Sequence, residues 1–227
     1  MKRLSSPNYN DRNSKIPVEY IVLHYTGMKD EKSALDRLLN PTMNVSAHYV
    51  IGEDGNVWHL VDENERAWHA GDSTWRGIKD MNSASVGIEL VNPGHQYGYR
   101  PYTDAQILAL KPLMREIIAR HVLSSATSLL AHSDISPSRK EDPGELFPWE
   151  SLALDGLGLW PIPSPQEFGP IKKNEVAETL YAIGYDTSDG EAALMAFQRH
   201  YCPENMGKGE DKDTIAKLRA LKRQMSA

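Results

Sequence analysis

Three side chains in this sequence could together bind a metal ion. His24 lies at the end of the run VEYIVLHYT, and His132 and Asp142 lie ten residues apart in the loop HSDISPSRKEDPG. Zinc prefers imidazole nitrogen and carboxylate oxygen, and a catalytic zinc site has three protein ligands and a fourth position for water. From the residues alone, this metal site and the alternative of two buried histidines beside a turn-forming aspartate are about equally supported.

Two further residues could take part in the chemistry. Glu89 interrupts the apolar run ASVGIELVN, where alternation places it on a largely buried strand. Burial of an unpaired carboxylate raises its pKa toward the range useful for a general base, and we favour this over pairing with an arginine. Lys140 precedes Asp142 by two residues, so both side chains point the same way in an extended loop. Its ammonium could stabilise an oxyanion, although a solvated loop lysine is the ordinary case.

The elements that must position these residues indicate an α/β layer domain that ends near residue 160. Apolar and β-branched runs predict strands over 18–26, 84–92 and 128–132, and residues 46–62 predict a hairpin around a Glu-Asp-Gly-Asn turn. Residues 103–123 begin with a capping box and keep helical spacing, with a kink expected at the internal proline. Alternating strands and helices are typical of a layered α/β domain.

The end of the chain changes character. Residues 161–170, PIPSPQEFGP, contain four prolines and predict a stiff linker. Residues 171–227 contain three segments with helical periodicity, separated by Gly and Asp turn signals. We therefore expect a small all-α, three-helix C-terminal domain, without a catalytic constellation of its own.

Composition restricts the partners. The net charge of −6 argues against nucleic acid, because binding to phosphates depends on clustered Lys and Arg. We expect no membrane span, because no apolar run approaches the roughly 18 residues that one requires. The single cysteine, Cys202, excludes an internal disulfide framework and fits a reducing compartment. The start of the chain has basic residues but no apolar signal region, so the cytoplasm is the favoured location.

Five motifs between about residues 17 and 150 resemble, in order, the zinc-dependent N-acetylmuramoyl-L-alanine amidases of the AmpD/AmiD type. They are VLHYT, VSAHYVI, AWHAGDSTWRG, SVGIELVNPG and AHSDISPSRKEDPGELFPW. The resemblance implies a catalytic domain over 1–160 with a central mixed β-sheet flanked by helices. More loosely, residues 171–227 resemble the three-helix peptidoglycan-binding module often attached to such amidases, after a linker over 161–170.

The resemblance also implies a site and a reaction. It assigns Zn²⁺ to His24, His132 and Asp142, the proton-transferring glutamate to Glu89, and oxyanion stabilisation to Lys140. The implied reaction is hydrolysis of the amide between the lactyl group of N-acetylmuramic acid, or its 1,6-anhydro form, and L-alanine of the stem peptide.

A second motif is less definite. Arg66, Trp68 and His69 match a family segment near the substrate groove and are predicted substrate contacts, although Trp68 could also be ordinary core. His48 matches the family pattern but is not among the family's ligands, so a structural role is expected. The remaining histidines are predicted to be surface or satisfied core residues: His59, His95, His121 and His200.

Three functions stay open at this point. The first is an amidase acting on soluble muropeptides in cell-wall recycling. The second is an amidase remodelling polymeric peptidoglycan, favoured by the C-terminal module because tethering raises local concentration; it would suit the periplasm if a leader had been removed. The third, a non-catalytic peptidoglycan binder, ranks last because all candidate ligands, Glu89 and Lys140 are present.

Overall fold

A mixed β-sheet forms the centre of the molecule. The computed structural model describes residues 1–226, and its six-stranded sheet has the order β1-β5-β4-β7-β3-β8. The strands are β1 (Lys2–Arg3), β3 (Tyr20–Tyr25), β4 (Tyr49–Ile51), β5 (Val57–His59), β7 (Ser85–Leu90) and β8 (Leu129–Ala131). Strand β3 pairs in parallel with β7 and β8, whereas β4 and β5 form an antiparallel hairpin. The predicted central mixed sheet and the predicted hairpin are confirmed.

A second, two-stranded sheet lies beside the first. It consists of β2 (Tyr9–Asp11) and β6 (Glu65–Ala67), which pair antiparallel. The short helix α2 (Met81–Ala84) leads directly into β7. Asp80 caps this helix with its side chain, which accepts a hydrogen bond from the backbone of Ser83.

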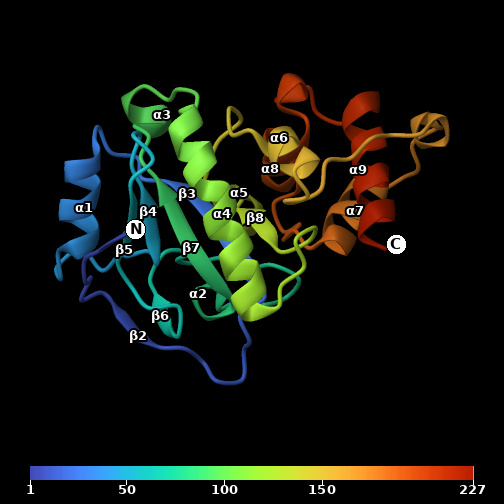
Figure 1. Ribbon diagram of the computed structural model, residues 1–227. Helices are drawn as coiled ribbons and strands as arrows, with labels where there is room; N and C mark the ends of the chain where they lie inside the picture. The colour runs from blue at the N-terminus through green and yellow to red at the C-terminus, as the bar shows by residue number, and fades with distance from the viewer. Residues whose placement is uncertain (227) are drawn as a thin grey trace.

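Helix α4 (Asp104–His121) covers one face of the sheet, in front of it in Figure 1. The predicted capping box forms between Thr103 and Gln106, and Pro112 lies inside the helix without ending it. The helix buries apolar side chains against alternate residues of β3 and β7, among them Ile21, Leu23, Val86, Ile88, Leu110 and Met114. Alternation of the strands therefore leaves His24 and Glu89 on the opposite face.

Short helices surround the sheet. Helix α1 (Glu31–Leu39) packs against the edge near β4, and α3 (Gly94–Tyr97), α5 (His132–Ile135) and α6 (Trp149–Leu154) lie in the connections. Among residues 1–226, no helix is both long and apolar enough to span a membrane.

The C-terminal helices pack directly on the opposite face of the sheet. They are α7 (Glu175–Ile183), α8 (Gly190–Tyr201) and α9 (Lys212–Met225), with two short 3-10 helices, η1 (Pro165–Phe168) and η2 (Pro203–Asn205). Tyr20 and Val22 of β3 share one hydrophobic cluster with side chains of all three helices. Figure 1 shows these helices beside β8, at the opposite side of the molecule from α1. Three helices were predicted here, but their core is continuous with that of the sheet.

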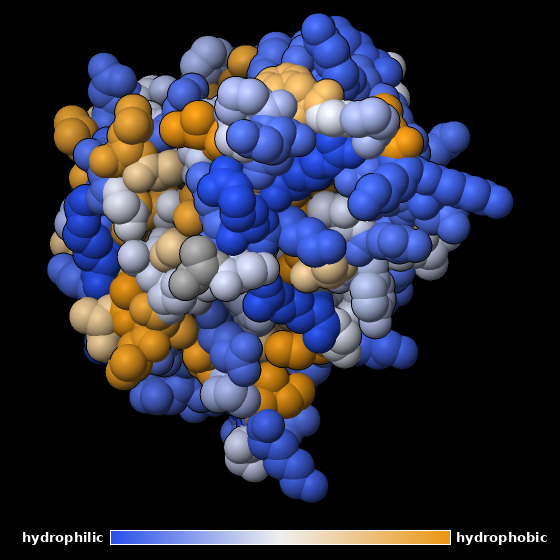
Figure 2. Space-filling view, turned by 90° about the vertical axis from the view of Figure 1, so that its right-hand side faces the viewer, coloured by the Kyte–Doolittle hydropathy of each residue, from blue (hydrophilic) through white to orange (hydrophobic). Residues whose placement is uncertain are grey.

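Hydrogen bonds and an ion pair hold the proline-rich segment against α9. Arg219 donates to the carbonyl oxygens of Glu167, Gly169 and Pro170, and Arg223 pairs with the Glu167 side chain at 2.8 Å. The segment predicted as a linker is thus held against the helices that it leads to. Figure 2 shows the side of the molecule that carries these helices, where hydrophilic side chains cover much of the surface and hydrophobic ones gather toward the left and lower edges.

Candidate metal centre and active site

Two histidines reach the same point because their strands are parallel neighbours. Leu23 of β3 lies opposite Ala131 of β8. The residue after Leu23 is His24, and the residue after Ala131 is His132. Both side chains are buried, with 1% and 3% of each residue exposed. The carboxyl ends of adjacent parallel strands are a common place for ligands to bind in α/β proteins.

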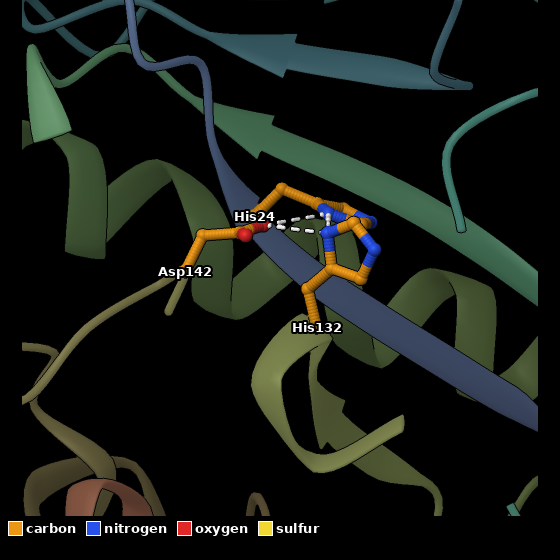
Figure 3. Close-up of side chains that lie close together, drawn as sticks. All are labelled: His24, His132 and Asp142. Atoms are coloured by element: carbon orange, nitrogen blue, oxygen red, sulfur yellow. Dashed lines mark hydrogen bonds and ion pairs between the residues drawn. The ribbon is translucent and has the colours of Figure 1, made fainter. Parts of the chain in front are cut away.

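Asp142 completes the group from the loop after α5. The carbonyl oxygen of Asp142 accepts a hydrogen bond from the Ser133 backbone at 3.0 Å, which brings the loop back over the start of α5. Its Oδ2 lies 2.9 Å from Nδ1 of His24 and 2.9 Å from Nδ1 of His132, and the two nitrogens are also 2.9 Å apart. Figure 3 shows the three side chains pointing toward one another from separate segments. They form a buried group with one ligand atom each, able to hold a metal ion.

The hydrogen bonds behind His132 leave its Nδ1 free. Nε2 of His132 lies 3.0 Å from the carbonyl oxygen of Ala70. A carbonyl oxygen only accepts, so His132 carries its proton on Nε2 and presents a lone pair at Nδ1.

A longer chain of hydrogen bonds has the same effect on His24. The hydroxyl of Ser85 donates to the carbonyl oxygen of Met81, so it accepts from Nε2 of His69 at 3.5 Å. Nδ1 of His69 is then the acceptor for Nε2 of His24 at 3.1 Å. This arrangement leaves Nδ1 of His24 without a proton, because a neutral imidazole carries one.

Three lone-pair atoms facing one another are electrostatically unfavourable unless a cation lies between them. A tetrahedral Zn²⁺ with bonds of about 2.0–2.1 Å separates its ligand atoms by about 3.3 Å, so the triangle would need to open by about 0.4 Å. The donor set and the tautomers therefore fit a zinc ion. Burial, followed by the charge of His132, lowers the pKa of His24 to about 4, which keeps its imidazole neutral. Burial alone would raise the pKa of Asp142, but the two histidines bring it well below its ordinary value.

Glu89 lies beside the metal-binding group on the neighbouring strand. It is paired in register with His24, and 8% of the residue is exposed. Within the described part of the chain, its buried Oε2 has no hydrogen-bond partner. Burial, and then the nearby charge of Asp142, raise the pKa of Glu89 well above its usual value. A carboxyl group with a raised pKa can both accept and return a proton near neutral pH.

Lys140 lines an open cleft beside the metal-binding group. The cleft has a volume of about 690 Å³, and its lining includes Tyr25, Lys140 and Asp142. Lys140 is half-buried. Burial, followed by the charge of Asp142, raises the pKa of the Tyr25 phenol to about 12, so it is a neutral hydrogen-bonding group.

The residues predicted to contact substrate lie elsewhere. Arg66 forms an ion pair with Asp80 at 2.9 Å, and the indole of Trp68 donates to Asn10 at 2.7 Å. His69 is buried behind His24 and packs against Gly87, where an added Cβ would clash with its ring. These three residues are not among those lining the cleft beside Lys140, so their contact with substrate stays a prediction. The structure gives His69 the definite role of orienting His24.

Sequence reasoning left Asp134 without a role, and the structure gives it one. The carboxylate is buried and accepts hydrogen bonds from the Ala131 backbone, the Tyr185 hydroxyl and His200, the last two at 2.7 Å. Tyr185 and His200 belong to the C-terminal part of the chain, so Asp134 joins it to the turn that carries His132. His200, predicted to be a surface or satisfied core histidine, is buried and hydrogen-bonded to Asp134. No local signal in the sequence pairs residues this far apart.

Arg199 and His95 were also missed. Arg199 on α8 and His95 on α3 line the cleft beside Lys140. An isolated arginine in a helical pattern and an isolated histidine in a loop carry no signal for such a position.

A buried His-His-Asp group beside an unpaired buried glutamate, at the carboxyl ends of parallel strands, is an arrangement that metal-dependent hydrolases use to activate water. Comparison with known proteins identifies the family. Residues 14–145 match the family model described as N-acetylmuramoyl-L-alanine amidase. The chain is 37% identical to the N-acetylmuramoyl-L-alanine amidase AmiD of Escherichia coli over 90% of this chain and 82% of AmiD. It belongs to the N-acetylmuramoyl-L-alanine amidase family and is an enzyme of that class.

Further relatives and solved structures support the same family. The 1,6-anhydro-N-acetylmuramyl-L-alanine amidase AmpD of Haemophilus influenzae is 32% identical over 66% of this chain and 88% of its own length. The solved structure of E. coli AmiD in complex with anhydro-N-acetylmuramic acid-L-Ala-D-γ-Glu-L-Lys superposes with a TM-score of 0.81, 35% identity and coverage of 95% of this chain and 93% of AmiD. AmpDH3 of Pseudomonas aeruginosa gives a TM-score of 0.82 at 32% identity, covering 92% of this chain and 93% of AmpDH3. The expected AmpD/AmiD-type fold and the amidase class are thereby confirmed.

Proposed function

We propose that this amidase uses Zn²⁺ held by His24, His132 and Asp142 to cleave the bond between the lactyl group of a muramic or 1,6-anhydromuramic residue and L-alanine, in muropeptide recycling. The observation that carries this proposal is the convergence of three unprotonated ligand atoms, 2.9 Å apart, beside the unpaired carboxyl group of Glu89. Bound there, Zn²⁺ would supply Lewis acidity, which lowers the pKa of water and polarises the substrate carbonyl.

Glu89 acts as the proton carrier in this proposal. It accepts a proton from the attacking water and delivers it to the alanine nitrogen as the amide bond breaks. Its burial supports this role, because a raised pKa makes the carboxylate a stronger base toward the attacking water, and the protonated carboxyl group is still a stronger acid than the ammonium form of the leaving amine.

Lys140 stabilises the negative charge that develops on the carbonyl oxygen. Its ammonium lies in the cleft that Asp142 also lines, and a positive charge held in position at a half-buried site stabilises an oxyanion more strongly than a mobile charge in water. Arg66, Trp68 and His69 are proposed as substrate contacts outside the cleft beside Lys140.

Soluble muropeptides are the proposed substrates because AmiD, whose solved structure matches 95% of this chain, was solved with an anhydromuramyl tripeptide. Action on polymeric peptidoglycan is the second candidate, favoured by the C-terminal helices as a peptidoglycan-binding module over 171–227, joined to the catalytic domain over 1–160 by the segment 161–170. The cytoplasm is the proposed compartment, and a reporter fused to the native full-length gene tests it, because secretion of the fusion would refute it.

Mass spectrometry of the products tests the substrate. Incubation with an anhydromuramyl peptide and, separately, with intact sacculi reports both the bond cleaved and the preferred substrate. We expect about one zinc per chain by metal analysis, and His132→Ala should abolish both zinc binding and cleavage. Full activity after exhaustive chelation would refute the metal mechanism.

A further inference from the structure

The cleft beside the metal-binding group has two walls from different parts of the chain. One wall is the loop that carries Lys140 and Asp142, and the other is helix α8, through side chains that include Glu191, Met195 and Arg199. A substrate that reaches the metal-binding group through this cleft therefore also meets the C-terminal helices.

Arg199 is the unusual residue of this second wall. Only 8% of its side chain is exposed, and its Nε has no hydrogen-bond partner within residues 1–226. Its nearest carboxylates, on Glu141 and Glu145, are both 3.8 Å away, which is too far for a hydrogen bond. A buried guanidinium with an unsatisfied N–H is costly unless a ligand completes it.

The two glutamates leave room for such a ligand. Both are already near His95: its Nε2 lies 3.1 Å from Glu145, and its Nδ1 lies 3.5 Å from the half-exposed Glu141. The two glutamates lie near the guanidinium of Arg199 but leave its N–H donors without hydrogen bonds from them. The lining of the cleft includes Arg139 and Lys140 on the opposite wall together with the carboxylates of Glu141, Asp142, Asp189 and Glu191, so a single anionic group has its counter-charge at the guanidinium of Arg199.

We propose that Arg199 binds a free carboxylate of the stem peptide, so that helix α8 of the C-terminal module forms part of the substrate site. This rests on the proposed function. A γ-linked glutamate, the residue after L-alanine, keeps its α-carboxylate free one residue beyond the scissile amide. A guanidinium is suited to it because its planar donors match a carboxylate with two parallel hydrogen bonds.

A pair of substrates that differ only in this carboxylate tests the proposal. One is N-acetylmuramoyl-L-Ala-γ-D-Glu-L-Lys with an amidated C-terminus, and the other also carries an amide in place of the glutamate α-carboxylate. We expect the wild-type enzyme to have the higher kcat/KM for the acid. Arg199→Gln should lower kcat/KM for the acid by about 10- to 100-fold, the range for loss of a charged hydrogen bond, and should leave the amidated substrate within about 3-fold.

Controls separate substrate binding from a structural effect. Arg115→Gln replaces an exposed arginine that does not line the cleft, and it should change neither rate. Arg199→Lys should retain part of the preference, because it keeps the charge and loses the two-pronged geometry. An equal loss for both substrates in Arg199→Gln, or no preference in the wild-type enzyme, would overturn the role of Arg199. Failure of the wild-type enzyme to cleave either substrate would instead refute the proposed function.

Discussion

Replacement of Glu89 by glutamine should remove activity and stabilise the protein at the same time. Glutamine has nearly the shape of glutamate but cannot transfer a proton. General acid–base assistance is typically worth a factor of about 10²–10⁴, so we expect kcat to fall by at least about 10², equivalent to roughly 2.7 kcal/mol of barrier. Zinc content should not change, because Glu89 is not one of the three grouped ligand residues.

The stability effect follows from the raised pKa of Glu89. Burial disfavours its charged form, so the unfolded chain releases this proton near the ordinary value of 4.5 while the folded protein still retains it. Above that pH, the carboxyl group lowers the free energy of unfolding by about 1.4 kcal/mol per pH unit until the folded pKa is passed. Glutamine places an uncharged amide where the unpaired Oε2 of Glu89 lies, so the difference in stability between the two proteins measures the cost of the buried charge.

Two measurements check the reasoning. Hydrolysis of a muramyl peptide by zinc-loaded enzyme gives kcat, and urea unfolding of the chelated protein at pH 4, 6 and 8 gives the stability difference, which should grow in favour of Glu89→Gln as pH rises. Glu210→Gln, at an exposed loop position, is the matched control and should alter stability by less than about 0.5 kcal/mol. Wild-type kcat in Glu89→Gln, or a variant less stable than wild type at pH 8, would refute this account.

Three further predictions concern the residues around this site. Lys140→Met should lower kcat by about 10²–10³ with little change in KM, measured on the same peptide, and an unchanged kcat would exclude an oxyanion role. His69→Ala should weaken zinc binding by about 10- to 100-fold in competition with a chelator, because His24 loses the partner that fixes its tautomer; equal affinity would contradict the hydrogen-bond chain. Asp134→Asn should lower the free energy of unfolding of the zinc-free protein by about 1–3 kcal/mol, because the buried donors of Tyr185 and His200 lose a charged acceptor, and a loss below about 0.5 kcal/mol would show that this contact is unimportant.

Much of the catalytic half of the fold could be predicted from local patterns. Alternation along each strand separates His24 of β3 and Glu89 of β7 from the apolar residues of the same strand, and these apolar residues pack on α4 in the structure. The capping box at Thr103 and the turn between β4 and β5 depend on neighbours within a few residues, which is why they could be read locally. The attachment of the proline-rich segment to α9 could not be predicted from local patterns, because it depends on Arg219, about fifty residues away.

The sequence by itself determined which chemical groups are available, namely imidazoles at strand ends, an aspartate in a loop, a glutamate within an apolar strand and a lysine two residues before the loop aspartate. These features depend on residue type and on the local period of the backbone. Only the tertiary structure decided which nitrogen of His24 and His132 is free, that His69 stands behind the site, and that Arg199 of the C-terminal helices reaches its cleft. Tautomers and distant contacts depend on partners that come together only when the sheet and the helices pack. The spacing of residues along the chain does not identify those partners.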